Sequence, residues 1–209
     1  MAAARLRGLY AVTPETNDTD GLVARVRDAI AGGVVLVQYR CKSSDVGMRR
    51  SQAQRLLALC RAAGVPLIIN DDLTLAAEIG ADGVHLGRDD AALSAARARL
   101  GGDALVGASC YGDLSAAETA SQAGASYVAF GAAFASTTKP NAVHAPVALY
   151  QQARQRLRLT IAAIGGIRVD NAAPLLAAGV ELLAVISDLF GAPDVAARAA
   201  QYAALFDAR

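Results

Sequence analysis

Short apolar runs alternate with longer, alanine-rich amphipathic stretches along the whole chain, and no other feature restricts the possible folds as strongly. Short β-branched or apolar runs indicate buried strands, and apolar residues spaced three and four apart indicate helices. Eight strands, each followed by a helix, match the count of a (β/α)8 TIM barrel. The expected strands are residues 8–13, 34–40, 66–71, 83–88, 104–110, 127–134, 160–166 and 182–188. The expected helices are residues 21–32, 47–63, 73–80, 90–100, 114–123, 146–157, 169–178 and 193–206.

The punctuation between these segments supports the same interpretation. Gly64, Gly80 and Gly179 follow helical stretches, where glycine commonly ends a helix. Nearly continuous apolar strands are typical of a parallel sheet covered by helices on its faces. No linker rich in proline, glycine or serine divides the chain, so we expect residues 1–209 to form a single α/β domain. A doubly wound open sheet is the alternative fold.

Composition and charge argue against several classes of partner. Twenty basic and nineteen acidic residues leave a formal charge of +1, without a lysine- or arginine-rich run, so neither nucleic acid nor an anionic membrane is an expected partner. Three cysteines without a CxxC pair predict neither a zinc site nor a disulfide framework. The apolar run near the start is too short for a secretory signal, and the uncharged stretch at 119–138 is too polar for a membrane span. We therefore expect a cytoplasmic protein.

The expected strands begin apolar and end polar, which predicts an active-site mouth at their carboxyl ends. Strand alternation after the buried run "GGVVLV" would place Gln38, Arg40 and Lys42 on one face. Arginine offers a planar fork to phosphate oxygens and lysine offers a compact charge. The three donors therefore favour an anion site, and the alternative is that they are solvated residues at a strand end.

Carboxylates follow the third and fourth expected strands. Asn70, Asp71 and Asp72 close the third strand, and "GRDD" at 87–90 closes the fourth, so one carboxylate from each could meet. Mg²⁺ is commonly held by one or two carboxylates while substrate phosphates and waters complete its coordination. The alternative is that Asp72 or Asp89 caps the next helix. His85 is interpreted as a packed barrel residue, and acyl transfer is not expected because no Ser-His-Asp arrangement is visible.

Two later segments could contact a ligand. The polar segment 136–146 after the sixth strand could close over a ligand through its hydroxyls and Lys139, or could be an ordinary surface loop. Gly165 and Gly166 lie at the end of the seventh expected strand, where glycine lets backbone N–H groups approach an oxyanion. Barrels often bind phosphate with the loops after strands seven and eight, although a glycine pair could equally form only a tight turn.

In order along the chain, "LYAVT", "VQYRCK", "LIINDD", "ADGVHLGRDD", "VGASC", "FGAAFASTTKP", "IGGIRVDNAAPLLAAG" and "AVIS" resemble the thiamine phosphate synthase family. The resemblance implies condensation of a pyrimidine-methyl pyrophosphate with a thiazole phosphate, releasing thiamine phosphate and pyrophosphate through a carbocation. It also implies Mg²⁺ held by Asp71 and Asp90, and catalytic roles for Arg40, Lys42, Lys139 and Ser109. Substrate contacts carried over by matching position are Gln38, Arg40, Lys42, Asn70, Ser109 and Lys139 for the pyrimidine and pyrophosphate, and Ser136, Thr138, Gly166, Ile186 and Ser187 for the thiazole phosphate.

Three positions depart from the family pattern. Arg88 stands where glutamine is usual, the loop "FASTTKP" is less proline-rich than usual, and Tyr111 stands where a histidine is common. Related thiazole tautomerases are expected to use that histidine, so Tyr111 disfavours a tautomerase. The other alternative is a non-catalytic barrel that binds a phosphate ligand, because fold does not determine function. The partners expected are small-molecule substrates, and a homo-oligomer is left open.

Overall fold

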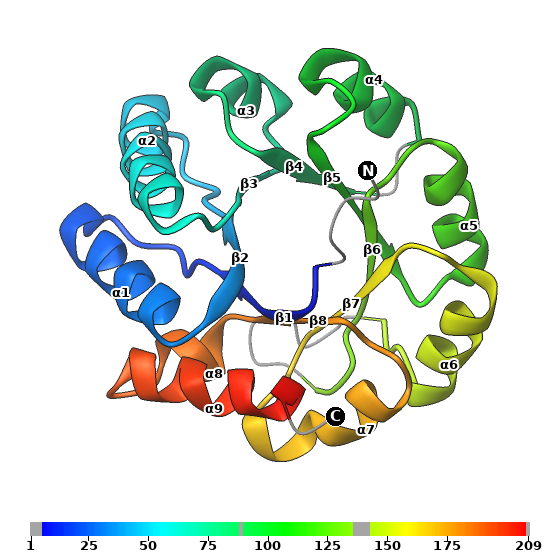
Figure 1. The fold of residues 1–209 in the computed structure, drawn as a ribbon. Helices are drawn as coiled ribbons and strands as arrows, with labels where there is room; N and C mark the ends of the chain where they lie inside the picture. The colour runs from blue at the N-terminus through cyan, green and yellow to red at the C-terminus, as the bar shows by residue number, and fades with distance from the viewer. Residues whose placement is uncertain (1–5, 88–89, 136–142, 208–209) are drawn as a thin grey trace.

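In the computed structural model, which describes residues 6–87, 90–135 and 143–207, eight parallel strands close into a barrel in the order β1 to β8 (Figure 1). Gly8 of β1 lies opposite Leu182 of β8, so no open edge remains between the first and last strands. The predicted (β/α)8 barrel is confirmed, and the open-sheet alternative is wrong. The strands are β1 Gly8–Val12, β2 Val34–Tyr39, β3 Leu67–Asn70, β4 Gly83–Leu86, β5 Leu105–Tyr111, β6 Tyr127–Phe130, β7 Thr160–Ile164 and β8 Leu182–Val185.

Helices surround the strand ring and pack against its outer face (Figure 1). The described helices are α1 Thr19–Ala31, α2 Val46–Ala63, α3 Leu73–Ile79, α4 Asp90–Leu100, α5 Leu114–Gln122, α6 Val147–Arg156, the 3₁₀ helix η1 Val169–Asn171, α7 Ala173–Ala177, α8 Ser187–Phe190 and α9 Val195–Asp207.

Helical boundaries differ from the sequence prediction after β7 and β8. The predicted helix 169–178 is split into η1 and α7, and Pro174 lies in the first turn of α7, where its missing N–H needs no helical acceptor. The short helix α8 was not predicted as a separate element, because four residues are too few to show a helical period.

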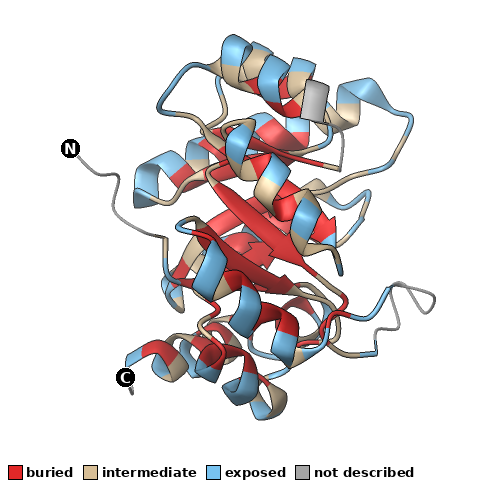
Figure 2. Cartoon of the chain, turned by 90° about the vertical axis from the view of Figure 1, so that its right-hand side faces the viewer, coloured by how far each residue is buried: buried red, intermediate tan, exposed pale blue. Residues whose placement is uncertain are grey.

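The strands separate two apolar clusters, as their period-two alternation requires. One cluster lies inside the barrel and includes Tyr10, Leu36, Ile68, Tyr127 and Leu182. The larger cluster lies between the strands and the inner faces of the helices. Figure 2 shows the same pattern, with buried residues on the strands and inner helix faces and exposed residues on the outer helix faces. The interior is therefore a packed core whose upper layer can carry a site.

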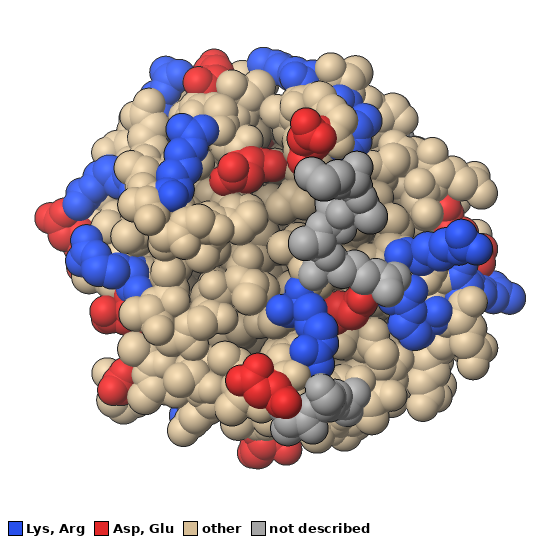
Figure 3. Space-filling model, viewed as in Figure 1, with Lys and Arg blue, Asp and Glu red and all other residues tan. Residues whose placement is uncertain are grey.

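Charged side chains of both signs are interspersed over the end of the barrel seen in Figure 3.

Within the described ranges, no helix combines the length and the apolar character needed to cross a membrane.

Candidate active site

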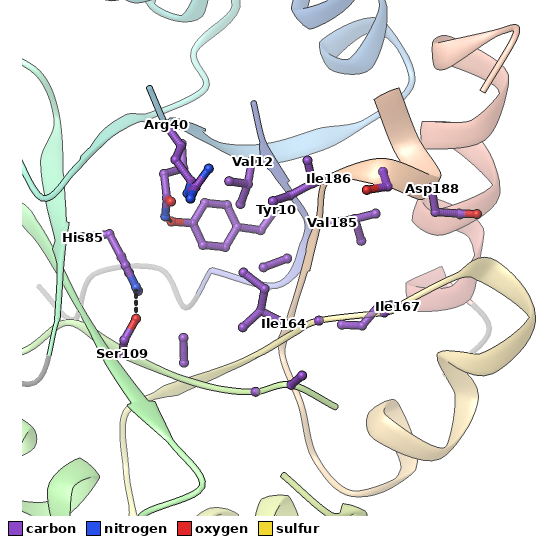
Figure 4. Close-up of a pocket in the computed structure, with 18 of the residues that line it drawn as sticks. Tyr10, Val12, Arg40, His85, Ser109, Ile164, Ile167, Val185, Ile186 and Asp188 are labelled. Atoms are coloured by element: carbon purple, nitrogen blue, oxygen red, sulfur yellow. Dashed lines mark hydrogen bonds between the residues drawn. The ribbon is translucent and has the colours of Figure 1, made fainter. Parts of the chain in front are cut away.

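A cavity of about 600 Å³ lies at the carboxyl ends of the strands, and every strand or the loop after it contributes to its wall. Figure 4 shows side chains from both ends of the chain around this opening. Seven residues proposed from the sequence line the cavity, and they are Gln38, Arg40, Asn70, Ser109, Gly166, Ile186 and Ser187. The structure therefore brings these residues together, while their individual roles remain predictions.

Gln38 and Arg40 both line the cavity, but only Gln38 lies on the strand that the sequence predicted for both residues. β2 ends at Tyr39, so Gln38 is an inward-facing strand residue and Arg40 belongs to the following loop. The Arg40 backbone is fixed by the buried Thr13, whose Oγ1 accepts a hydrogen bond from the Arg40 N–H at 2.9 Å. Among the described residues, no carboxylate forms an ion pair with the Arg40 guanidinium. Arg40 lines the cavity, so a positive charge borders the space that a ligand would occupy.

Lys42 does not line the same cavity, and the expectation that Gln38, Arg40 and Lys42 share one face is wrong. The strand geometry ends at Tyr39, so alternation no longer applies at Lys42. Lys42 lines a neighbouring, more open hollow of about 490 Å³. Asn70 borders both spaces, so the hollow and the cavity are adjacent at the end of β3.

The neighbouring hollow also contains Asp71 and Asp72, which have different surroundings. Asp72 accepts a hydrogen bond from Leu75 N at 2.8 Å as the N-cap of α3, and it lies 3.4 Å from Arg49. The capping alternative is therefore confirmed for Asp72. Asp71 adopts a positive φ of 61° and accepts a hydrogen bond from Asn70 Nδ2 at 2.8 Å, which leaves carboxylate lone pairs for a further ligand.

The donor set in this hollow is suited to a hard cation that also binds phosphate. Asp71 N donates to the carbonyl oxygen of His85 on β4, so the segment after β3 is tied to the neighbouring strand. α4 begins at Asp90, the second predicted ligand, but the Asp90 side chain lies outside the described residues. The described residues contain no cluster of three or more His, Cys, Asp or Glu side chains. An all-protein metal cage is therefore not present there, whereas one or two carboxylates completed by substrate phosphates and water would fit Mg²⁺.

A hydrogen-bonded network forms the floor of the cavity. Tyr10 and Tyr127 hydroxyls lie 2.7 Å apart, Gln38 Nε2 donates to Tyr10, and His85 Nδ1 lies 3.0 Å from the Tyr127 hydroxyl. His85 Nε2 lies 2.8 Å from Ser109 Oγ, and Figure 4 shows the His85 ring pointing from β4 towards Ser109 on β5. Burial lowers the pKa of His85 from 6.5 to about 4 and raises the pKa values of both tyrosines. The floor is therefore polar but uncharged at neutral pH.

The sequence interpretation of His85 as a packed barrel residue was incomplete. His85 is buried, but it also lines the cavity and contacts Ser109. The register of the strands shows why, since Asn70 of β3 lies opposite His85 and His85 lies opposite Gly107, two residues before Ser109. Inward residues of neighbouring parallel strands share a layer, so polar residues at these positions belong to one site.

The loops after β7 and β8 form the opposite part of the wall. Gly165 and Gly166 have φ values of 99° and 61°, which residues with a Cβ rarely adopt. Asn171 Nδ2 donates to the Gly166 carbonyl oxygen at 3.0 Å and holds this turn. Ile186 and Ser187 line the cavity at the start of α8. The turn after β7 and the start of α8 therefore line one side of the cavity with glycines and a serine, residue types that are common in phosphate sites.

Comparison with known proteins was consistent across sequence and structure. The family profile described as Thiamine monophosphate synthase matches residues 9–189. The chain belongs to this family. A thiamine-phosphate synthase of Aromatoleum aromaticum is 54% identical over 208 residues, covering 100% of both chains, and one of Thiobacillus denitrificans is 57% identical over 201 residues, covering 96% of this chain and 95% of the relative. A solved thiamine phosphate pyrophosphorylase from Pyrococcus furiosus has a TM-score of 0.85 at 28% identity and covers 96% of each chain.

The resemblance to the thiamine phosphate synthase family that the sequence motifs indicated is thus confirmed. Three residues carried over from it, Ser136, Thr138 and Lys139, lie outside the described residues, as does the Asp90 side chain. Arg88, one of the departures from the family pattern, also lies outside them. Tyr111, the departure that disfavours a tautomerase, lines the cavity and is 41% exposed. An aromatic side chain therefore occupies the position where the tautomerases of this wider group are expected to place a histidine.

Proposed function

We propose that the chain is a thiamine phosphate synthase, which joins 4-amino-2-methyl-5-(diphosphooxymethyl)pyrimidine to 4-methyl-5-(2-phosphooxyethyl)thiazole and releases thiamine phosphate and pyrophosphate. One observation carries this proposal beyond family membership. Two candidate anion-binding regions, around Arg40 and around Gly166, border a cavity with a neutral polar floor. That arrangement suits two phosphorylated substrates whose rings meet between the regions.

The proposed reaction is dissociative. Pyrophosphate leaves first, and its negative charge grows beside Arg40, with Lys42 in the adjoining hollow. The pyrimidine retains the positive charge as a carbocation, and the thiazole nitrogen then captures it. Such a reaction needs no protein nucleophile, only stabilisation of the leaving group and alignment of two rings. The cations of the loop after β2 match the first requirement.

Binding roles follow from which elements supply each residue. We propose that Gln38, Asn70 and Ser109 contact the pyrimidine end of the first substrate, because their side chains come from the inward layer of β2, β3 and β5. Gly166 and Ser187 hold the thiazole phosphate, because the turn after β7 and the start of α8 line the same side of the cavity.

We also propose that the reaction requires Mg²⁺, held by Asp71 and Asp90. The cation, when bound, would neutralise charge on the pyrophosphate oxygens. Asp71 would supply carboxylate oxygen, and Lys42 in the same hollow would supply a second positive charge towards the pyrophosphate. We also propose that residues 1–209 form one catalytic domain and that the protein acts in the cytoplasm.

The decisive experiment is incubation with both substrates and Mg²⁺, with thiamine phosphate and pyrophosphate measured by chromatography. Formation of both products at equal rates supports the synthase. Isomerisation of a thiazole carboxylate phosphate without condensation would instead identify a tautomerase. A ligand-induced rise in melting temperature without turnover of either kind would identify a phosphate-binding barrel without catalysis.

A further inference from the structure

A continuous chain of hydrogen bonds crosses the barrel floor between two residues given pyrimidine contacts above. It runs from Gln38 through Tyr10, Tyr127 and His85 to Ser109, so it draws on strands β2, β1, β6, β4 and β5. Tyr10, Tyr127 and His85, the three residues between the two ends, have no role in the reaction proposed above. Their hydrogen bonds nevertheless decide which atoms at the two ends can donate to a ligand.

With the Gln38 amide oriented as in the structure, counting protons along this series of hydrogen bonds assigns one direction to each of the other bonds. Gln38 Nε2 donates to the Tyr10 oxygen, so the proton of Tyr10 is directed to the Tyr127 oxygen. The Tyr127 proton then goes to His85 Nδ1, which must be unprotonated. Neutral imidazole carries its one proton on Nε2, and that proton goes to Ser109 Oγ. The Ser109 proton is left to donate into the cavity.

Turning the Gln38 amide around would reverse every bond. Its Oε1 would accept from Tyr10, Tyr10 from Tyr127, and Tyr127 from a proton on His85 Nδ1. The Ser109 proton would then be used on His85 Nε2, and Ser109 would offer the ligand only an acceptor. The two ends are therefore coupled, and the tautomer of His85 reports which direction holds.

The local packing is shaped around this chain. A Cβ on Gly107 would lie less than 3.0 Å from the Tyr127 ring and from His85 Nδ1, so glycine leaves the room in which these two groups meet. The Tyr127 ring also stacks on His85 at a centroid separation of 5.6 Å. Tyr10 and Tyr127 are fully or almost fully buried, which makes an unpaired hydroxyl at either position unfavourable.

We propose that Tyr10, Tyr127 and His85 are positioning residues that set Ser109 as a hydrogen-bond donor and the Gln38 carbonyl as an acceptor for the substrate ring. This inference rests on the proposed function. A 4-aminopyrimidine carries an amino donor next to a ring-nitrogen acceptor, which complements this pair. A 4-oxopyrimidine presents the reverse pattern at those atoms and should be disfavoured, because a buried polar group would lose its partner.

The first test is nuclear magnetic resonance of ¹⁵N-histidine-labelled protein. The chain has only two histidines, so a His144→Gln variant assigns both sets of ring signals. We expect the His85 signals of an Nε2–H tautomer at pH 7, with Nδ1 shifted as a hydrogen-bond acceptor. An Nδ1–H tautomer or an imidazolium would overturn the proposed direction. This measurement needs no substrate, so it is independent of the proposed function.

The second test is calorimetry on Tyr127→Phe, with Tyr150→Phe as the matched control. Tyr150 is also a buried tyrosine, but its hydroxyl donates to the Phe130 carbonyl at 3.1 Å outside the floor chain. Tyr127→Phe should weaken binding of the pyrimidine pyrophosphate by about tenfold, the usual effect of one hydrogen bond. The ratio of its affinities for the 4-amino substrate and the 4-oxo analogue should decrease, whereas its affinity for the thiazole phosphate should stay unchanged. Tyr150→Phe should change neither the affinities nor their ratio.

Two outcomes would contradict the positioning role. One is an equal loss for both substrates in Tyr127→Phe, and the other is wild-type preference for the amino over the oxo ring. If Tyr127→Phe fails to fold, Tyr10→Phe interrupts the same series of hydrogen bonds at the Tyr10–Tyr127 bond. It must then show the same decrease in the ratio of affinities for the amino and oxo rings. The proposed function fails separately, through absence of thiamine phosphate in the two-substrate assay.

Discussion

Replacing Gly166 with alanine tests whether the turn after β7 must keep its backbone open. Gly166 has a φ of 61°, and an added Cβ would lie less than 3.0 Å from the carbonyl oxygens of Phe134 and Ala135. Gly64, the C-cap of α2, has nearly the same φ of 67° but nothing within 4 Å of the same added atom. The Gly64→Ala variant therefore carries the backbone strain alone, while Gly166→Ala carries strain and steric conflict.

The expected magnitudes follow from these two contributions. Left-handed backbone strain, partly offset by the reduced entropy of the unfolded chain, should make Gly64→Ala less stable by about 1 kcal/mol. Displacing the backbone near Ala135 should cost a further ~1–3 kcal/mol, the usual range for overpacking. For a chain of this length, Gly64→Ala should lower the melting temperature by about 2–4 °C and Gly166→Ala by about 5–15 °C.

The assay combines thermal unfolding with calorimetric titration of both substrates. Gly166→Ala should also weaken thiazole phosphate binding by about tenfold or more, since the displaced turn would remove a hydrogen bond to a charged group. Binding of the pyrimidine pyrophosphate should change less, because Arg40 belongs to a different loop. Equal melting temperatures for the two variants would refute the steric argument. Unchanged thiazole phosphate binding in a destabilised Gly166→Ala protein would refute the assignment of that site.

Four further predictions can be checked with single variants. Arg40→Ala should lower kcat by about 100-fold with the fold intact by circular dichroism, and Arg40→Lys should restore only part, because lysine lacks the two-pronged geometry; a wild-type single-turnover rate would contradict this. Asp71→Asn should raise the Mg²⁺ concentration needed for half-maximal rate, whereas full activity after chelation would argue against any metal. Ser187→Ala should weaken thiazole phosphate binding and spare the pyrimidine substrate in separate titrations. Burial gives His85 a pKa of about 4 in the folded state against 6.5 in the unfolded state, so the unfolded state binds one more proton as the pH falls. The free energy of unfolding should therefore decrease by about 3 kcal/mol between pH 7 and pH 4, as measured by urea titration. The decrease should be smaller in His85→Gln.

The barrel could be predicted from the sequence because each strand and helix has its own periodic pattern. Strand ends were less predictable, since hydrogen bonding to a neighbour decides where a strand stops. β6 ends at Phe130, although apolar residues continue to Phe134. The segment 133–134 instead bonds to residues after β7, with Ala133 N donating to the Ile164 carbonyl. Composition alone does not reveal such tertiary pairing.

The candidate site was predictable where a residue type and a strand end coincide, as at Arg40 and Gly166. The site was not predictable where neighbouring residues of the same type have different roles. Asp71 and Asp72 are neighbours of the same type, yet only three-dimensional contacts separate the helix cap from the carboxylate in the hollow. The floor chain was missed for a related reason, because its members are spread over five strands and tyrosine in a strand is usually an ordinary core residue.

The distribution of charge across the cavity fits the proposed chemistry better than a uniformly basic pocket would. Charged side chains among its described lining residues, Arg40, Arg168 and Asp188, lie in loops or on α8, beyond the strand ends. Negative charge would grow on the departing pyrophosphate near Arg40, while positive charge would grow on the ring above the neutral floor. A unit positive charge held ~4 Å from the ring would oppose this by about 4 kcal/mol at an effective dielectric constant of 20. Burial keeps His85 uncharged and so avoids that opposition, while its hydrogen bond still orients Ser109. The same residue thus supplies direction without charge, which is what a carbocation next to it requires.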